Sequence, residues 1–276
     1  FLLQVRELIV QKNINLDNNV FNSSLLKLKK KITKLQKRHY NLLGKKTVFG
    51  VMPDWNPAEM IGTKPKKLAY SLYEELITNH VWANQRKSFG YRDLTSHHLL
   101  TNFLGTPFVD IRVDFNSWIP SSLDKKISEK LVNFYTNKFC KNLYLYDKIE
   151  FNIVFTCSTL DINERIKELK KNNFTNHEIS LIQKNLTKVT NKSILDFEQN
   201  HKNLNKLEET NKKINNSDIY LIDKIYWLIE DCKKYGTYTF AGAARCGFIA
   251  IEMLESMVRK KIVNQVEKIN RKFQWA

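Results

Sequence analysis

The chain has 276 residues, of which 42% are hydrophobic and 12% aromatic, enough for a substantial core in one large domain or two small ones. No run of eighteen apolar residues occurs, which excludes a membrane-spanning helix. The formal net charge is +17, but the lysines are spread along predicted helices among many asparagines, so the charge does not favour nucleic acid as a partner.

Residues 1–44 are predicted to form a helical lead-in to the main domain. The opening FLLQVRELIV has no basic segment or cleavage site of a signal peptide and resembles the middle of a longer segment. We therefore expect the chain to be a piece of a longer polypeptide. Apolar residues at helical spacing predict a helix over 23–43, capped by Ser23 or Ser24 and ended by Gly44.

Residues 45–276 are predicted to form a single α+β domain. It is predominantly helical, with a small, largely antiparallel sheet built from residues 47–157. Strands are expected at 47–52, 108–115 and 149–157. Helices are expected at 66–88, at 123–140 with a cap from Ser121 or Ser122, within 162–214 as a polar, exposed hairpin, at 218–235 and at 239–270.

The segment 50–62 combines two prolines, two glycines, two carboxylates, an amide and an indole. Proline fixes φ and removes a hydrogen-bond donor, so this segment is predicted to form a rigid turn rather than a helix or strand. Rigid loops rich in polar groups suit a small polar ligand, and Asp54, Asn56 and Glu59 are the candidate substrate-binding residues. A structural loop that caps the core is an equal alternative.

The predicted strand 108–115 places Asp110, Arg112 and Asp114 on one face, about 7 Å apart, so that the arginine can bridge both carboxylates. These three are the candidate catalytic residues, and Asn116 follows at the strand's exit. If strand 149–157 pairs with this one, Glu150 joins the same wall. A solvated strand face is the alternative.

The third candidate segment is 235–247, in which Thr239 is predicted to cap a helix that begins with small residues. A helix N-terminus attracts anions, and Arg245 would reinforce it. Tight helix packing is the alternative. Arg86, Tyr91 and Arg92 form a second possible anion clamp, against an alternative of ordinary surface charge.

The sequence predicts no disulfide, no metal site and no nucleotide-binding motif. The four cysteines are far apart without a CxxC pair, which indicates free thiols in a reducing compartment. The adjacent His97 and His98 diverge on any regular element, so no metal site is expected. The sequence has no P-loop and no GxGxxG, so this is not the nucleotide-holding part of an enzyme.

Four long segments carry a resemblance to a known family. In chain order they are FGVMPDWNPAEMIGTKPKKLAYSLYEELITNHVWANQRKSFGYRDL, GTPFVDIRVDFNSWIP, DKIEFNIVFTCSTLD and DKIYWLIEDCKKYGTYTFAGAARCGFIA. Over residues 45–260 the chain resembles the central region of phosphoenolpyruvate-synthase-like phosphotransferases. The resemblance implies an acceptor-binding domain that works with an ATP-grasp domain and a phosphohistidine domain of the same polypeptide, both absent from this chain. ATP and Mg²⁺ would serve the full enzyme, and this fragment would bind neither and be inactive alone.

The resemblance further implies a bacterial cytoplasmic enzyme of capsule polysaccharide phosphoramidate biosynthesis, whose acceptor is the side-chain amide of L-glutamine. Asp110 or Asp114 would then face the amide, Arg112 or Arg245 would take a carboxylate or phosphoryl group, and Glu59 would take the α-amino group. Two alternatives stay open. One is a related domain for another small carboxylate such as pyruvate, and the other is a basic module for anions or nucleic acid.

Overall fold

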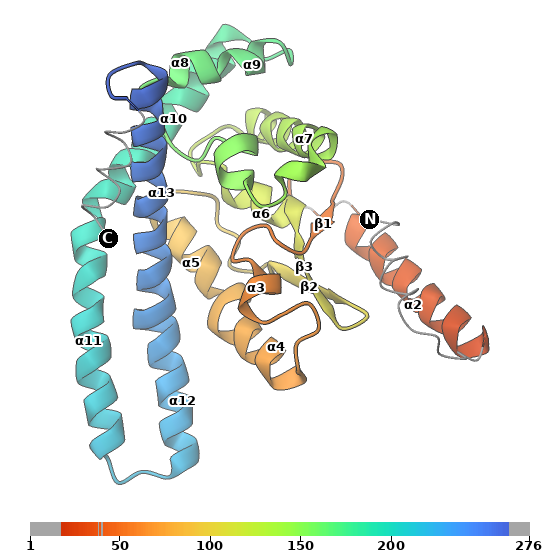
Figure 1. Cartoon of the computed structure of the whole chain (residues 1–276), viewed down its shortest axis with the longest axis vertical. Coiled ribbons are helices and arrows are strands. Elements are labelled where there is room, and N and C mark those ends of the chain that lie inside the picture. The colour runs from red at the N-terminus through yellow and green to blue at the C-terminus, as the bar shows by residue number, and fades with distance from the viewer. Residues whose placement is uncertain (1–17, 38, 40, 265–276) are drawn as a thin grey trace.

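A computed structural model describes residues 18–37, 39 and 41–264, and its fold class is the predicted one, predominantly helical with a small antiparallel sheet (Figure 1). The three strands are β1 (Phe49–Gly50), β2 (Leu100–Phe103) and β3 (Thr106–Asp110), in the order β1-β3-β2. Phe49 pairs with Asp110, so the end of β3 lies directly beside the start of the proline-rich turn.

The predicted strand 108–115 is wrong beyond Asp110, where the chain turns into α6 (Ile111–Ser117). The Asp110 carboxylate accepts hydrogen bonds from the backbone N–H groups of Arg112 and Val113, which is an N-cap and starts the helix. Every residue from Thr106 to Ser117 is buried, so the alternation of polar and apolar residues does not distinguish a solvent-exposed face from a buried one.

The predicted strand 149–157 is also wrong. Its first half is a π-helical turn, η3 (Ile149–Ile153), and the chain leaves it in extended form at Val154. This segment packs on α7 (Lys125–Lys141), where the Tyr135 hydroxyl accepts a hydrogen bond from the Phe155 N–H. Asp124 caps α7, in place of the predicted Ser121 or Ser122, because its carboxylate accepts from the first free N–H groups.

The predicted helix 66–88 is interrupted. It consists of α4 (Lys67–Tyr73), the π-helical turn η1 (Glu74–Thr78) and α5 (Val81–Ser88), and the short α3 (Pro57–Met60) precedes it. Trp82 of α5 and Trp118 at the end of α6 are almost fully buried. These indoles belong to the main core, and they bring α5 and α6 together beneath the proline-rich turn.

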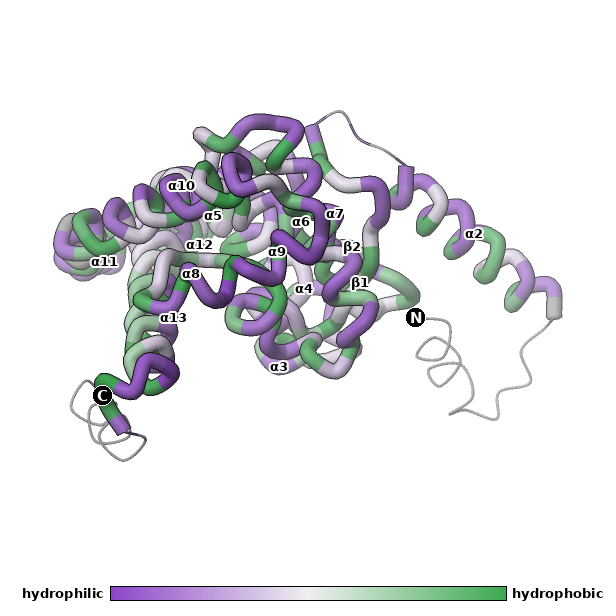
Figure 2. The backbone as a smooth tube through the Cα atoms, turned by 90° about the horizontal axis from the view of Figure 1, so that it is seen from above, coloured by the Kyte–Doolittle hydropathy of each residue, from purple (hydrophilic) through white to green (hydrophobic). Residues whose placement is uncertain are grey.

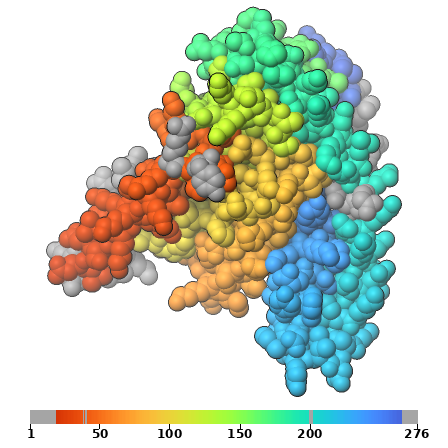
Figure 3. Space-filling model, turned by 180° about the vertical axis from the view of Figure 1, so that it is seen from behind, coloured from red at the N-terminus to blue at the C-terminus, as the bar shows by residue number. Residues whose placement is uncertain are grey.

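The C-terminal part is a set of long helices, α10 (Asn176–Leu195), α11 (Phe197–Asn216), α12 (Leu221–Asp231) and α13 (Tyr238–Arg259). A π-helical turn, η4 (Cys232–Thr237), joins α12 to α13 without a break. The predicted cap at Thr239 is therefore wrong, because this residue lies within a continuous helix. The polar segment forms α11, and its hairpin partner is α12. Figures 1 and 3 show this hairpin projecting from the body.

α2 (Asn18–Gln36) projects from the opposite side of the body (Figure 2), and it ends before the predicted position of 43. Leu28 packs with Phe49, Phe103 and Phe108 in a small separate core on the sheet. The other short helices are η2 (Leu143–Leu145), α8 (Ile162–Arg165) and α9 (Lys167–Lys170). Predicted elements within 1–17 and beyond 264 lie outside the described residues. Among the helices that the structure does describe, none has the length and apolarity to cross a membrane.

Candidate functional site

A cavity of about 560 Å³ lies between the proline-rich turn, α5 and α13. This volume is in the range of small-molecule sites. Its walls come from five separate segments of the chain. The lining residues are Met52, Asp54, Trp55, Asn56, Glu59, Met60, Trp82, Gln85, Arg86, Trp118, Asp147, Glu150, Phe151, Phe240, Ala241, Ala244, Arg245 and Phe248.

The turn that forms one wall has an unusual backbone. Asp54, Trp55 and Asn56 have φ values of 41°, 54° and 39°, so three consecutive non-glycine residues are left-handed. Such conformations cost free energy and persist only where the surroundings impose them. The Tyr73 hydroxyl donates a hydrogen bond to the Trp55 carbonyl, and the Asn56 side chain accepts from the Glu59 N–H to start α3. The turn is thus held from both sides.

Arg86 of α5 fixes the turn to the core. Its guanidinium forms a 2.6 Å ion pair with Asp54 and a 3.3 Å ion pair with Asp114, and all three side chains are almost fully buried. It also lies 3.8 Å from the Trp118 ring centroid, and the Trp118 indole N–H donates to Asp114. Burial acts to lower the pKa of Arg86, but the two carboxylates outweigh it and raise this pKa.

The carboxylates of the site repel one another. Burial, and then the charge of Asp54, raise the pKa of Asp114 well above its usual value. The same two causes raise the pKa of Glu150 to about 7. Glu150 lines the cavity on η3, whereas Asp114 lies beneath Arg86 with no exposed side-chain surface. Glu150 is therefore the carboxyl that can exchange a proton with a bound molecule near neutral pH.

Arg245 of α13 forms the opposite wall. Its side chain lies 4.8 Å from the Trp118 ring centroid, and one terminal nitrogen donates to the Thr156 carbonyl. Only 3% of Arg245 is exposed, and its Nε and Nη1 atoms have no partner in the described part of the chain. Buried polar atoms without partners are rare and costly in folded proteins.

Other buried polar atoms at this cavity also lack partners within the described ranges. They include an acceptor, Oδ2 of Asp54, and two donors, Nε2 of Gln85 and Nε1 of Trp82. Arg245 and Asp54 thus place a buried base and a buried acid in the walls of one cavity, which matches a ligand with a negative and a positive end. The exposed Phe240 ring, 6.0 Å from the Trp55 ring, adds apolar surface at the rim.

Five of the predicted site residues share this cavity, namely Asp54, Asn56, Glu59, Glu150 and Arg245. Asp114 does not line it but bonds to two residues that do, Arg86 and Trp118.

The remaining three predicted site residues do not reach the cavity and hold the fold together instead. Asp110 caps α6 and accepts from the Thr47 hydroxyl at 2.5 Å. The Arg112 guanidinium donates to the carbonyls of Leu35 and Lys37 at the end of α2. Asn116 pairs with both backbone groups of Leu43. The predicted Asp–Arg–Asp row is therefore wrong, because the chain becomes helical after Asp110.

The predicted clamp of Arg86, Tyr91 and Arg92 is divided as well. Arg86 belongs to the cavity, whereas the Tyr91 hydroxyl donates to the Thr156 carbonyl and Arg92 donates to the Asn41 carbonyl. Sequence reasoning considered Arg86 only for this clamp and missed its ion pairs with Asp54 and Asp114. A signal was present, because Trp82 and Arg86 stand one helical turn apart and therefore share a face.

The described residues contain no group of three or more His, Cys, Asp or Glu side chains that could hold a metal ion. The four cysteines are free, with Cys157 buried and Cys140 exposed. Burial raises the pKa of the Cys157 thiol, so it is a packed side chain rather than an activated nucleophile.

Comparison with known proteins adds no relative. No protein-family model, no curated protein and no solved structure matches this chain.

Proposed function

We propose that this chain is the acceptor-binding part of an L-glutamine kinase, an ATP-dependent phosphotransferase that phosphorylates the side-chain amide of L-glutamine. The nucleotide and the phosphohistidine donor would belong to other domains of the same polypeptide. The four sequence segments that resemble phosphoenolpyruvate-synthase-like phosphotransferases support the assignment to this family. The size and lining of the cavity support a small polar molecule as the acceptor. The free thiols are consistent with the proposed location in the bacterial cytoplasm.

One observation carries the proposal. A single small cavity presents unpartnered donors of Arg245 and an unpartnered acceptor of Asp54, both buried. A free amino acid has a carboxylate at one side of its α-carbon and an ammonium group at the other. The carboxylate would bind Arg245, the ammonium group would bind Asp54 or Glu59, and the aromatic rim would cover the aliphatic part.

Glu150 takes the role of the group that faces the amide. An amide nitrogen is a weak nucleophile because its lone pair is delocalised. In the proposed transfer a nitrogen–phosphorus bond forms, the bond between phosphorus and the donor breaks, and one amide proton passes to the Glu150 carboxylate. A pKa of about 7 suits this proton transfer at neutral pH.

A related domain for another small carboxylate such as pyruvate is the second candidate, and the apolar rim around Arg245 favours it. Pyruvate has no ammonium group, so it would leave the Oδ2 atom of Asp54 without a partner, although Oδ1 keeps its ion pair with Arg86. The two candidates therefore differ in whether the acidic side of the cavity contributes to binding.

Calorimetric titration of the folded chain with L-glutamine, L-asparagine, L-glutamate and pyruvate tests the proposal. We expect L-glutamine to bind best, and Arg245→Gln to weaken it at least about tenfold, because a buried charge-assisted hydrogen bond is lost. Arg92→Gln, a half-buried arginine outside the cavity, is the matched control. Preferred binding of pyruvate would favour the second candidate. No binding of any of the four, or equal loss in the control, would refute both.

A further inference from the structure

The hairpin of α11 and α12 carries a large exposed apolar surface. None of the eleven residues of α12 is buried, although seven of them are apolar or aromatic. Six large side chains at the tip and along α12 are between 40% and 83% exposed, namely Ile219, Tyr220, Leu221, Ile222, Ile225 and Tyr226. At roughly 200 Å² for each side chain, these fractions leave roughly 700 Å² uncovered, whereas the largest apolar patch of a typical monomer is about 300–600 Å².

The apolar side chains of α12 form a stripe along one side of the helix. Positions 221, 222, 225, 226 and 229 recur at helical spacing, so they share a face, and none of them is charged. The Lys224 ammonium group donates to the Asn215 carbonyl of α11 at 2.9 Å, which turns the side of Lys224 and Leu228 toward α11. The stripe therefore lies on a face that α11 leaves open, on a hairpin that extends past the body (Figures 1 and 3).

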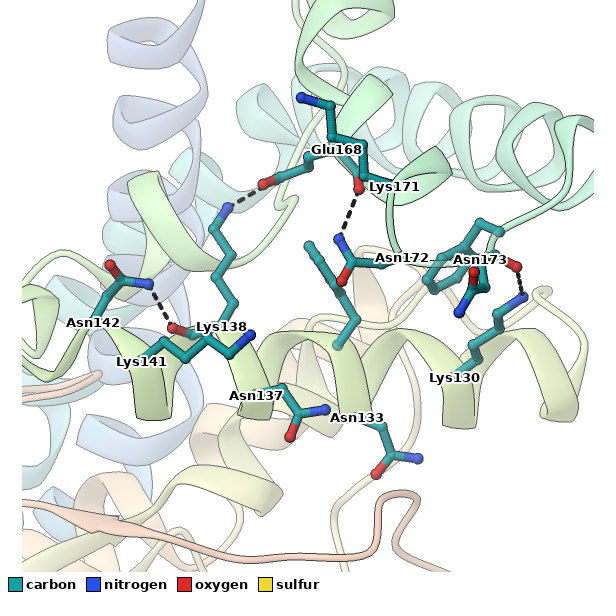
Figure 4. A pocket seen from close by; sticks show the side chains of 12 residues that line it. Lys130, Asn133, Asn137, Lys138, Lys141, Asn142, Glu168, Lys171, Asn172 and Asn173 are labelled. Atoms are coloured by element: carbon teal, nitrogen blue, oxygen red, sulfur yellow. Dashed lines mark hydrogen bonds and ion pairs between the residues drawn. The ribbon is translucent and has the colours of Figure 1, made fainter.

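The hairpin differs in charge from the rest of the chain. From residue 197 to residue 231 the sequence has five lysines, no arginine and seven carboxylates, against 45 basic and 28 acidic residues in the whole chain. Other parts of the surface are basic, for example a cavity between α7 and the turn after α9, which four lysines line together with a single acid, Glu168 (Figure 4). Two copies of the chain would therefore repel each other through their bodies and least through their hairpins.

These observations favour a second copy of the chain as the occupant of the stripe. The acidic hairpin disfavours nucleic acid and anionic lipid. A second α12 has the same length, about 16 Å, and the exposed area is close to the roughly 800 Å² that each partner buries in a standard interface.

We propose that two copies of this chain pair through these stripes, with their α12 helices antiparallel about a two-fold axis near Ile225. The stripe is uncharged, so this contact takes no charge out of water. The antiparallel direction places the two bodies at opposite ends of the paired hairpins, where they do not collide. The proposal goes beyond the proposed function and does not depend on it.

Sedimentation velocity of the full chain from about 1 to about 100 μM, in about 0.15 M salt to screen the charge of the bodies, tests the pairing. We expect the dimer to predominate at the upper concentration. Ile222→Glu should weaken it at least about tenfold, because this change places a charge in an apolar contact. Ile222 is exposed, so the variant is expected to fold. Leu26→Glu changes an exposed leucine of α2, on the opposite side of the body (Figure 2), and this matched control should dimerise as the parent chain does.

A charge-swap experiment tests both the identity of the occupant and the two-fold axis. Ile225 lies in the middle of the stripe, so in the antiparallel pair it faces its own counterpart. Ile225→Glu and Ile225→Lys should each be monomeric, because like charges meet, and an equimolar mixture should regain dimers, because opposite charges meet. Circular dichroism checks that each variant is folded. A parent chain that is monomeric at every concentration, equal weakening in Leu26→Glu, assembly beyond the dimer, or a mixture that stays monomeric would overturn the proposal.

Discussion

Replacing Glu150 by glutamine should change how the stability of the protein depends on pH. The pKa of Glu150 rises from 4.5 to about 7 on folding, because of burial and the charge of Asp54. A carboxyl with a raised pKa favours folding while it is protonated in both states, below about pH 4.5. Between this pH and about 7 the unfolded chain releases the proton and the folded chain keeps it, so stability falls.

The shift corresponds to about 3 kcal/mol at most, and solvent at the cavity mouth reduces this to roughly 1–3 kcal/mol. Glu150→Gln removes the ionisation, so the variant should gain that amount over the parent chain at pH 8 and almost none at pH 4.5. Urea unfolding followed by tryptophan fluorescence at pH 4.5, 6, 7 and 8 measures it. Glu59→Gln, on the exposed rim of the same cavity, controls for the lost charge and should change stability by less than about 0.5 kcal/mol. A constant difference between Glu150→Gln and the parent at every pH would refute the reasoning.

Three other substitutions distinguish residues that shape the cavity from a residue that only stabilises the fold around it. Arg86→Met should destabilise the protein by about 3–5 kcal/mol in urea unfolding, because it leaves Asp54 and Asp114 buried without their cation; a loss below 1 kcal/mol would contradict this. Tyr73→Phe should cost about 1 kcal/mol and weaken L-glutamine binding in calorimetry, since it frees the left-handed turn, and unaltered binding would argue against such a positioning role. Asp110→Ala should cost about 0.5–2 kcal/mol through the lost N-cap yet leave L-glutamine binding unchanged, and weakened binding would show that the frame and the cavity are coupled.

The parts of the site that local chemistry controls could be predicted from the sequence. Proline, glycine and short polar side chains determine a turn within a few residues, and the rigid turn predicted within 50–62 is present at residues 54–56. The prediction was wrong for Pro57–Met60, which form the short helix α3, and for Gly50, which ends β1. Asp54, Asn56 and Glu59 do line a cavity. Arg245 also lies there. The reason given for Arg245 was wrong, because the expected helix start at Thr239 is inside a continuous helix.

The parts that failed depend on tertiary burial. Alternation of polar and apolar residues indicates a strand only where one face meets water, and around Asp110 both faces are buried. The buried Arg112 is satisfied by carbonyls of α2, some 75 residues away in sequence, and no local pattern reveals such a partner. The grouping of Arg86 with Asp54 and Asp114 is likewise a contact between distant segments that only the folded chain brings together.

The continuous helix from Leu221 to Arg259 joins the acceptor cavity to the tip of the projecting hairpin. From Arg245 to Leu221 the helix rises about 36 Å, at 1.5 Å per residue. A tilt of about 5° at the cavity wall would therefore move the tip by roughly 3 Å. If the helix moves as a rigid rod, a small adjustment around a bound molecule would become a larger displacement at the hairpin tip, which a label at the exposed Tyr220 would register.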